Sequence, residues 1–270
     1  MISEKEQELL RTKYNPDGSN LRKAQLRMAE MLAYLDAICK KHNIPYWITA
    51  GTLLGAVRHG GFIPWDDDSD IYIMEKDFKK LIEILKKEKS EDFVWQDHDT
   101  DKNYFNFWGV LRDLKSEYVK DYYDNVHIIR KYRGLQVDVF PVSDKTYSTL
   151  WRINRKISYK ILKLLNASNK KNIIKAQCWY FFNKILVFIF NCFGLLKFRK
   201  DKVRQTYGNW SKREYDKNVI FPLSRIIFEG IELNAPKDPH QFLVMQYGAD
   251  YENVPSQDKI KNHNAKVSFS

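Results

Sequence analysis

The first strong pattern along the chain is a set of apolar residues at helical spacing: Leu21, Met28, Leu32, Leu35 and Cys39. This spacing predicts an amphipathic helix that buries one face. The helix follows the turn signal Asn15–Gly18, so Ser19 or Asn20 is its expected N-cap. It is expected to end near residues 42–43, because the following Pro45 cannot continue it.

Strand and helix patterns then alternate. Short apolar or alternating runs predict strands at residues 46–49, 68–74, 93–96, 107–112 and 135–142. Between them, helices are expected after Gly51 and from about Phe78 onward, where apolar residues again recur at helical spacing. Strands mixed with helices predict an α+β (mixed α/β) catalytic core over residues 1–144.

The character of the chain changes at about Lys145. Residues 147–165 are basic and amphipathic, and Cys178–Phe198 is rich in Phe, Ile, Leu and Val but interrupted by Lys184. Its longest uninterrupted run, Ile185–Leu196, is well short of the roughly 20 apolar residues of a membrane-spanning helix. We therefore expect a basic helical insertion at 145–215 that associates with a membrane surface or packs as a subdomain. Residues 216–270 are expected to pack back on the core.

Charge separates this segment from the rest of the chain. Residues 145–215 hold 17 Lys or Arg and 2 Asp or Glu, whereas the whole chain has a net charge of +11. Basicity confined to one segment favours an attachment surface over a nucleic-acid-binding protein, and no nucleic-acid-binding module is recognisable. The three cysteines form no CxxC pair, so we expect neither a disulfide framework nor a cysteine zinc site. The charged N-terminus predicts no secretory signal.

The candidate chemistry begins at Trp65–Asp70, where Asp66, Asp67, Asp68 and Asp70 crowd into five positions. Carboxylates this close repel one another unless a cation lies among them. On a strand Asp68 and Asp70 point the same way, which suits a hard cation, Mg²⁺ first and Mn²⁺ as the alternative. A solvated acidic loop is the bland alternative, but the apolar strand that follows at once disfavours it.

A third carboxylate, Asp138, interrupts the apolar run Leu135–Pro141. An unpaired charge there would be costly, so Asp138 is expected to bind the metal or act as a base. Pairing with an arginine is the structural alternative.

Donor binding is expected around Gly51 and Thr52, at a turn into a helix. Glycine lets the backbone approach a phosphate, and a helix N-terminus offers unpaired N–H groups to an anion. The basic residues that could hold phosphate oxygens are Arg58, His59, Arg112 and Lys115. For each of them a surface role is an equal alternative, and His59 could be a general base or a hydrogen-bonding loop residue.

These motifs together resemble the LicD family, which includes the fukutin-type proteins. The resemblance is carried by the blocks Gly51–His59, Gly61–Ile71, Val137–Pro141, Phe221–Leu223, Phe228–Gly230 and Tyr247–Gly248, and by the preceding helix, Leu21–His42. It spans residues 20–142 and 220–263. Two positions depart from the family pattern: Ala50 stands where many members have glycine, and Ser69 where a β-branched apolar residue is common.

The resemblance implies a nucleotidyltransferase-type fold, with the Gly-Thr turn at Gly51–Thr52, paired aspartates at Asp68 and Asp70, and a third acid at Asp138. Bacterial members are thought to transfer phosphocholine from CDP-choline to teichoic acid, lipopolysaccharide or capsule sugars. Fukutin-type relatives transfer ribitol phosphate from CDP-ribitol. We therefore expect a sugar hydroxyl to attack the phosphorus next to the donor alcohol and CMP to leave.

In this reaction Asp68 and Asp70 would hold Mg²⁺, and Asp138 would complete the metal site or take the hydroxyl proton. Asp66 and Asp67 would lie outside the direct metal ligands or orient the donor. A choline group would need an aromatic cage, for which the candidates are Trp65, Tyr104, Trp108 and Tyr122. The acceptor is expected to be a lipid-linked glycan, which places the enzyme in the cytoplasm, peripheral on the inner face of the membrane. The alternatives are a nucleotidyltransferase with another acceptor and a catalytically inactive module that binds membrane or nucleic acid.

Overall fold

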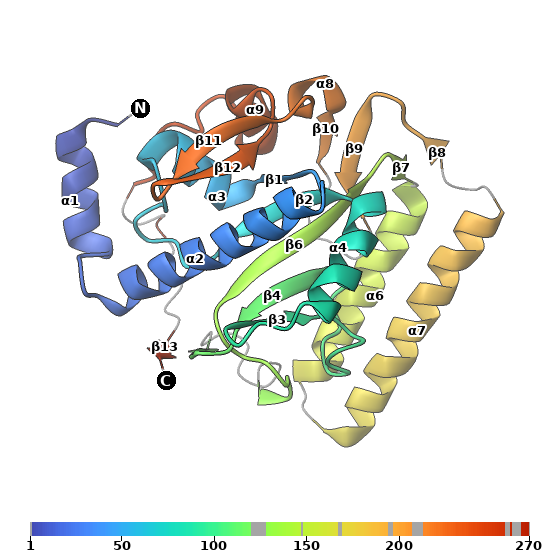
Figure 1. The fold of residues 1–270 in the computed structure, drawn as a ribbon. Coiled ribbons are helices and arrows are strands. Elements are labelled where there is room, and N and C mark those ends of the chain that lie inside the picture. The colour runs from blue at the N-terminus through green and yellow to red at the C-terminus, as the bar shows by residue number, and fades with distance from the viewer. Residues whose placement is uncertain are drawn as a thin grey trace.

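A mixed seven-stranded sheet organises the protein in the computed structural model (Figure 1). The structure describes residues 2–119, 128–146, 148–166, 169–193, 197–206, 213–256, 260 and 266–269. The central path runs β1 (Tyr46–Ile48), β2 (Asp70–Met74), β6 (Gln136–Ser143), β4 (Gly109–Asp113) and β3 (Phe93–Gln96). Only the β2–β6 pair of this path is parallel. Sheet and helices together confirm the predicted α+β class.

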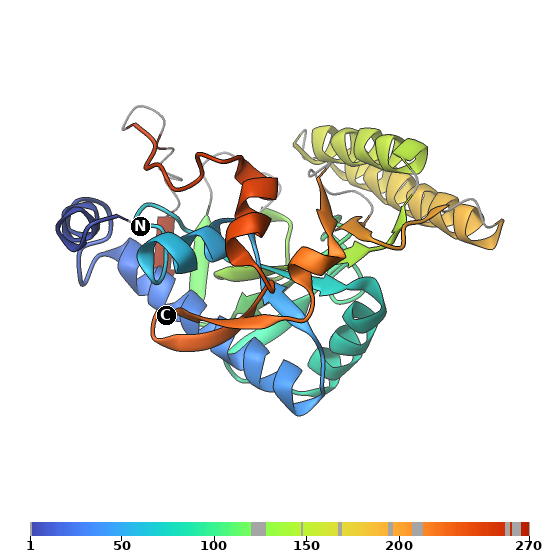
Figure 2. The same cartoon turned by 90° about the horizontal axis from the view of Figure 1, so that it is seen from above.

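Helices cover both sides of the sheet. The helices α2 (Asn20–Lys41) and α4 (Glu75–Lys87) lie on one side (Figures 1 and 2). On the other side, α9 (Pro239–Tyr247) packs against α3 (Ala50–His59). The predicted N-cap of α2 is confirmed at Ser19, whose hydroxyl accepts a hydrogen bond from the Arg22 N–H.

The strand periodicity has a simple physical outcome in β2. Ile71 and Ile73 are fully buried, which explains the alternation in the sequence. The strand begins at Asp70, however, two residues later than predicted, so Asp67 and Asp68 lie in the loop that leads into it. This shift decides how the carboxylates can meet.

Residues beyond 145 leave the sheet and return to it. A short β7–β8 pair (Lys145–Thr146 with Lys197–Phe198) closes a hairpin of two helices, α6 (Ser148–Asn166) and α7 (Lys170–Cys192). The hairpin projects from the body of the protein (Figure 2). Strand β9 (Lys202–Gln205) then pairs with the end of β6, and β10 (Glu214–Asp216) pairs with β9. Among its described residues, the basic segment is thus helical in its first two thirds and forms short strands after that.

Among the described helices, one stretch, Lys170–Phe190 in α7, is long and apolar enough by length and composition alone to cross a membrane. The sequence predicted a shorter apolar stretch, because the uninterrupted apolar run begins only after Lys184. The whole helix is longer, and its charged residues are few enough for it to remain apolar on average.

The C-terminal residues pack on the core from two places. The hairpin β11 (Ser224–Phe228) and β12 (Ile231–Ala235) contacts β1 and α2, and the short helix α8 (Lys217–Ile220) contacts α9. Strand β13 (Lys266–Phe269) pairs with β5 (Ser116–Val119). The first helix, α1 (Glu4–Tyr14), lies at the periphery and buries none of its residues.

Candidate active site

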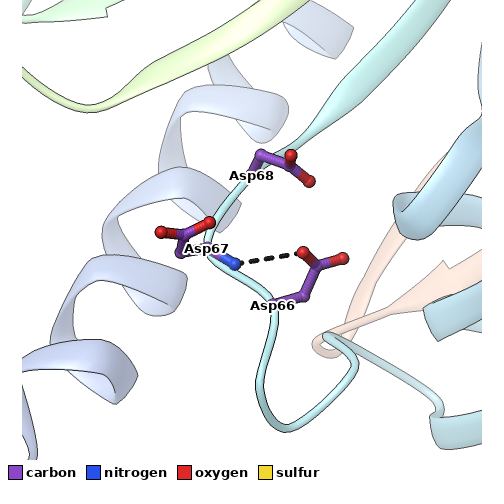
Figure 3. Close-up of side chains that lie close together, drawn as sticks. All are labelled: Asp66, Asp67 and Asp68. Carbon is purple, nitrogen blue, oxygen red and sulfur yellow. Dashed lines mark hydrogen bonds between the residues drawn. The ribbon is translucent and has the colours of Figure 1, made fainter. Parts of the chain in front are cut away.

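Three aspartates meet in the loop before β2. Asp66, Asp67 and Asp68 each present a carboxylate oxygen within 4.8 Å of the others. Figure 3 shows the carboxylates of Asp66 and Asp68 directed to the same side, with Asp67 turned towards the helix behind the loop. The Gln25 side chain on that helix fixes the loop by donating to the backbone carbonyls of Ile63 and Asp66. A rigid helix therefore positions this acidic cluster.

The electrostatics of the cluster favour a bound cation. Burial, followed by the negative charges of Asp68 and Asp67, raises the pKa of Asp66 well above its ordinary value. The donor set is three carboxylates, the oxygen ligands that hard divalent cations prefer. The residues present therefore fit Mg²⁺ or Mn²⁺.

Asp70 and Asp138 form a second acidic pair beside this cluster. They are register partners on the parallel strands β2 and β6, so their side chains leave the sheet on the same face. The Asp138 carboxylate accepts hydrogen bonds from Trp108 Nε1 at 2.6 Å and Gln136 Nε2 at 2.5 Å. The Asp70 N–H donates to the Thr52 hydroxyl, which ties α3 to the start of β2.

Two tyrosines show that both acidic groups share one region. The Tyr118 hydroxyl donates to Asp67 at 2.9 Å. Burial and then Asp67 raise the pKa of Tyr118, and the charges of Asp68 and Asp138 add to this effect. The pKa of Tyr247 is raised by burial and then by Asp70, Asp66 and Asp68. Asp68 acts on both tyrosines.

The predicted metal ligands are thus distributed in a specific way. Within the described chain, the carboxylates that meet in a group of three are Asp66, Asp67 and Asp68. Asp68 belongs to this group, whereas Asp70 and Asp138 lie beside it on the sheet. Asp66, which the sequence suggested as a donor-orienting residue, is the aspartate of this group whose pKa is raised by burial and by its two neighbours.

The N-terminus of α3 faces this region. Gly51 lies so close to the cluster that an added Cβ would stand 2.4 Å from Oδ2 of Asp66. The preceding Ala50 has φ +50°, a left-handed conformation that favours glycine. A glycine at position 50 would adopt this conformation without the steric cost of a Cβ.

Arg58 and His59 have hydrogen-bond partners within the protein. Arg58 donates to the backbone carbonyls of Tyr251 and Asn253 and to the His59 ring, so it fastens the C-terminal loop. The other ring nitrogen of His59 contacts Gln7. Burial and then the Arg58 charge lower the pKa of His59 to about 3. A neutral imidazole with both nitrogens engaged supports the hydrogen-bonding alternative for His59.

The remaining predicted residues divide between the core and the surface. Arg112 is buried and donates to Gln96 and to the carbonyl of Gly134, and Lys115 forms an exposed ion pair with Asp92. Tyr104 is also buried.

Among the choline-cage candidates that the structure describes, Trp108 donates a hydrogen bond from its Nε1 to the Asp138 carboxylate. Trp65 packs edge-on against Tyr14 and His59. Tyr122 lies outside the described residues.

Sequence reasoning did not predict a role for two residues near the acidic cluster, Tyr247 and its neighbour Arg213. Tyr247 ends α9, is nearly half exposed, and lies within electrostatic reach of three aspartates. The Arg213 guanidinium lies over the Tyr247 ring, 5.9 Å from its centroid. The Tyr247–Gly248 dipeptide was part of the family resemblance, but no signal in the sequence linked it to Arg213.

A mixed sheet with an acidic loop and a helix N-terminus at its edge defines a nucleotidyltransferase-type domain. Comparison with known families agrees, because residues 43–163 match the model described as LicD/FKTN/FKRP, nucleotidyltransferase domain. The chain therefore carries a LicD-family domain, as the sequence motifs predicted.

Individual relatives extend the similarity beyond this domain. The chain is 28% identical over 277 residues to lipopolysaccharide cholinephosphotransferase LicD of Haemophilus influenzae, covering 92% of this chain and 97% of that protein. It is 32% identical over 74 residues to human ribitol 5-phosphate transferase FKRP, covering 26% of this chain and 15% of that protein. It is also 32% identical to the uncharacterized protein RP689 of Rickettsia prowazekii over 143 residues, 45% of this chain and 52% of that protein.

Proposed function

We propose that the protein is a metal-dependent transferase that moves a phosphorylated alcohol from a CDP-linked donor to a sugar hydroxyl of a cell-surface glycan. The observation that carries the proposal is the Asp66–Asp68 cluster beside the α3 N-terminus. The names of two relatives, a cholinephosphotransferase and a ribitol 5-phosphate transferase, support the class of group transferred. Phosphocholine is the favoured group, because the cholinephosphotransferase is similar over most of both chains.

In the proposed reaction, the acceptor oxygen forms a bond to the phosphorus next to the donor alcohol. The bond from that phosphorus to the bridging oxygen breaks, and CMP leaves with the bridging oxygen. Asp66 and Asp68 would hold Mg²⁺, with Asp70 at its edge; a bound divalent cation supplies neutralisation of the diphosphate charge. Asp138, whose carboxylate accepts hydrogen bonds from Trp108 and Gln136, would accept the hydroxyl proton.

The donor phosphates are expected at the α3 N-terminus and near Arg213. The structure engages Arg58 with the C-terminal loop and places Arg112 in the core, so neither is our first choice. The Arg213 guanidinium lies over the ring of Tyr247, and the negative charges of Asp70, Asp66 and Asp68 act on Tyr247. An arginine there has the geometry to bind phosphate oxygens in pairs.

The test is incubation of the purified protein with Mg²⁺ and a panel of CDP-alcohols, with CMP release as the readout. CMP released from CDP-choline, and abolished reversibly by EDTA, would support the proposal. CMP from CDP-ribitol alone would keep the reaction and change the alcohol. Pyrophosphate released from a nucleoside triphosphate, with all CDP-alcohols inert, would instead assign the alternative nucleotidyltransferase reaction.

The proposed acceptor is a lipid-linked glycan that is assembled at the inner face of the membrane. This places the enzyme in the cytoplasm at that surface. An enzyme held beside its acceptor gains effective concentration without any new contact at the active site.

A further inference from the structure

The outer face of α7 exposes large apolar side chains from Ile174 to the end of the helix. Seven large apolar side chains from 41% to 73% exposed follow it: Ile174, Phe181, Phe182, Ile185, Phe188, Ile189 and Phe193, the last just beyond the helix end. Their spacing of three, four and seven residues places them on one side of the helix. Contiguous apolar surface of this kind marks an interaction site.

The opposite face of α7 already has a partner. Ala176 and Tyr180 are buried in a cluster with Phe105 and with Ile157 and Ile161 of α6. Tyr180 also stacks on His98 at 4.0 Å and on Phe107 at 4.8 Å. One side of the helix thus holds the hairpin on the protein, and only the other side is available.

The neighbouring helix presents charge in place of apolar groups. The exposed face of α6 carries Arg152, Lys156, Lys160 and Lys163, with Tyr159 among them. Over residues 148–192 the sequence has nine Lys or Arg and no Asp or Glu. Unbalanced positive charge on one helix of the hairpin and exposed apolar side chains on the other suit anionic headgroups and acyl chains, respectively.

We propose that the α6–α7 hairpin docks the protein on an anionic membrane, with the outer stripe of α7 inserted at the headgroup level and the basic face of α6 against the headgroups. This inference rests on the proposed function, and it names the surface that would hold the enzyme at the membrane.

Shallow docking fits the structure better than spanning. A spanning α7 would have to leave Tyr180 and Ala176 without their partners on the core. In addition, β7 and β8 pair at the base of the hairpin, so its two ends leave from the same side. A single pass through a bilayer would separate those ends.

The experiment is co-sedimentation of the full chain with vesicles of phosphatidylcholine alone or with phosphatidylglycerol added, in the absence of any donor. Binding is expected only with the anionic lipid and is expected to weaken as salt is raised. Two variants test the two faces: Ile185→Asp with Phe188→Asp in α7, and Arg152→Gln with Lys156→Gln and Lys163→Gln in α6. Each is expected to lower the partition coefficient at least tenfold.

Matched control variants show whether a loss of binding is specific to the surface of the α6–α7 hairpin. Leu9→Asp with Ile227→Asp places the same charges at exposed apolar positions elsewhere. Lys5→Gln with Lys23→Gln and Lys237→Gln removes the same charge from other exposed positions. Both controls are expected to bind as the parent chain does, and unchanged melting temperatures verify folding.

Several outcomes would overturn the docking proposal. These are equal recovery in the supernatant with and without anionic vesicles, binding that the two α7 substitutions leave intact, and a dimer in light scattering that these substitutions dissociate. Protein that resists extraction from vesicles by high salt and alkaline carbonate would show spanning in place of docking. CMP release by the same samples is measured in solution, so a failure to bind leaves the proposed reaction separately testable.

Discussion

Gly51 and Asp66 are in such close contact that a single added methyl group would collide with the carboxylate. The Cβ of an alanine at position 51 would stand 2.4 Å from Oδ2 of Asp66. The atom it meets is the end of a short side chain, which can move aside at little cost in stability. Movement of Asp66 would nevertheless disturb the acidic cluster.

The first prediction is that Gly51→Ala lowers transfer activity roughly 10- to 100-fold, since small misplacements of catalytic groups have effects of this size. The melting temperature is expected to change little. Gly134→Ala is the matched control, because its Cβ would stand 1.9 Å from the backbone oxygen of Asp113, which cannot move freely. That variant is expected to lose stability by about 1–3 kcal/mol. A large loss of stability in Gly51→Ala with activity per folded molecule unchanged would contradict the prediction.

The second prediction concerns the carboxylates. Asp66→Asn and Asp68→Asn are each expected to lower CMP release roughly 100-fold or more and to weaken Mg²⁺ binding in calorimetry, because each removes a charged oxygen ligand from the cluster. Asp70→Asn and Asp138→Asn, the other predicted positions, are expected to lower CMP release as well. Asp250→Asn, on an exposed loop, is the control.

The Mg²⁺ affinities of these variants distinguish a metal ligand from a base. If Asp138 acts mainly as the base, Asp138→Asn keeps most of its Mg²⁺ affinity while it loses activity. Equal loss of affinity in Asp70→Asn and Asp138→Asn, with affinity retained in Asp66→Asn, would restore the ligand set that the sequence suggested. Full activity of the parent chain in EDTA would contradict the metal requirement altogether.

The third prediction is that Ala50→Gly raises the free energy of unfolding by about 0.5–1 kcal/mol. Ala50 has φ +50°, and the strain of that conformation exceeds the extra unfolded-state freedom that glycine brings. Asn43→Gly is the control, because Asn43 has φ +53° but asparagine tolerates this region. Urea denaturation of both variants measures the difference. A loss of stability in Ala50→Gly equal to that in Asn43→Gly would show that position 50 is not strained.

The fourth prediction concerns the Arg22–Glu229 ion pair, which joins α2 to the β11–β12 hairpin. Arg22 donates two hydrogen bonds to Glu229, at 2.9 and 2.7 Å, and both side chains are mostly buried. Glu229→Gln is expected to destabilise the protein by about 2–3 kcal/mol, because it leaves a mostly buried guanidinium without its counter-charge. Glu88→Gln, which disrupts the more exposed pair with Lys41, is expected to cost less than about 1 kcal/mol.

The stabilisation by this ion pair is expected to depend on pH. Burial alone would raise the pKa of Glu229, but the hydrogen bonds from Arg22 and from the Phe62 N–H outweigh it, so the pKa is lowered. The stabilisation is therefore complete above the unfolded-state pKa of about 4.3 and is lost as the pH falls through the lower folded-state value. Thermal unfolding of the parent chain and Glu229→Gln between pH 7 and pH 3 measures this, and the difference between them is expected to shrink at the acid end.

The sequence by itself determined the local elements and the location of the chemistry. Apolar periodicity predicted α2, β2 and α4, because a helix or strand that buries one face must repeat its apolar residues at a fixed spacing. The acidic loop was equally evident, since four carboxylates in five positions have no ordinary role in a core. The family motifs identified the same residues, and the matched domain confirms the family.

Only the tertiary structure decided which side chains meet. The start of β2 at Asp70 leaves Asp67 and Asp68 in a loop, and loop geometry has no fixed period from which a sequence could predict it. Arg58 binds carbonyls near the other end of the chain, and Tyr247 reaches the carboxylates from α9. These contacts join residues far apart in the sequence. They depend on how whole elements pack, whereas a pattern along the chain records only what its neighbours require.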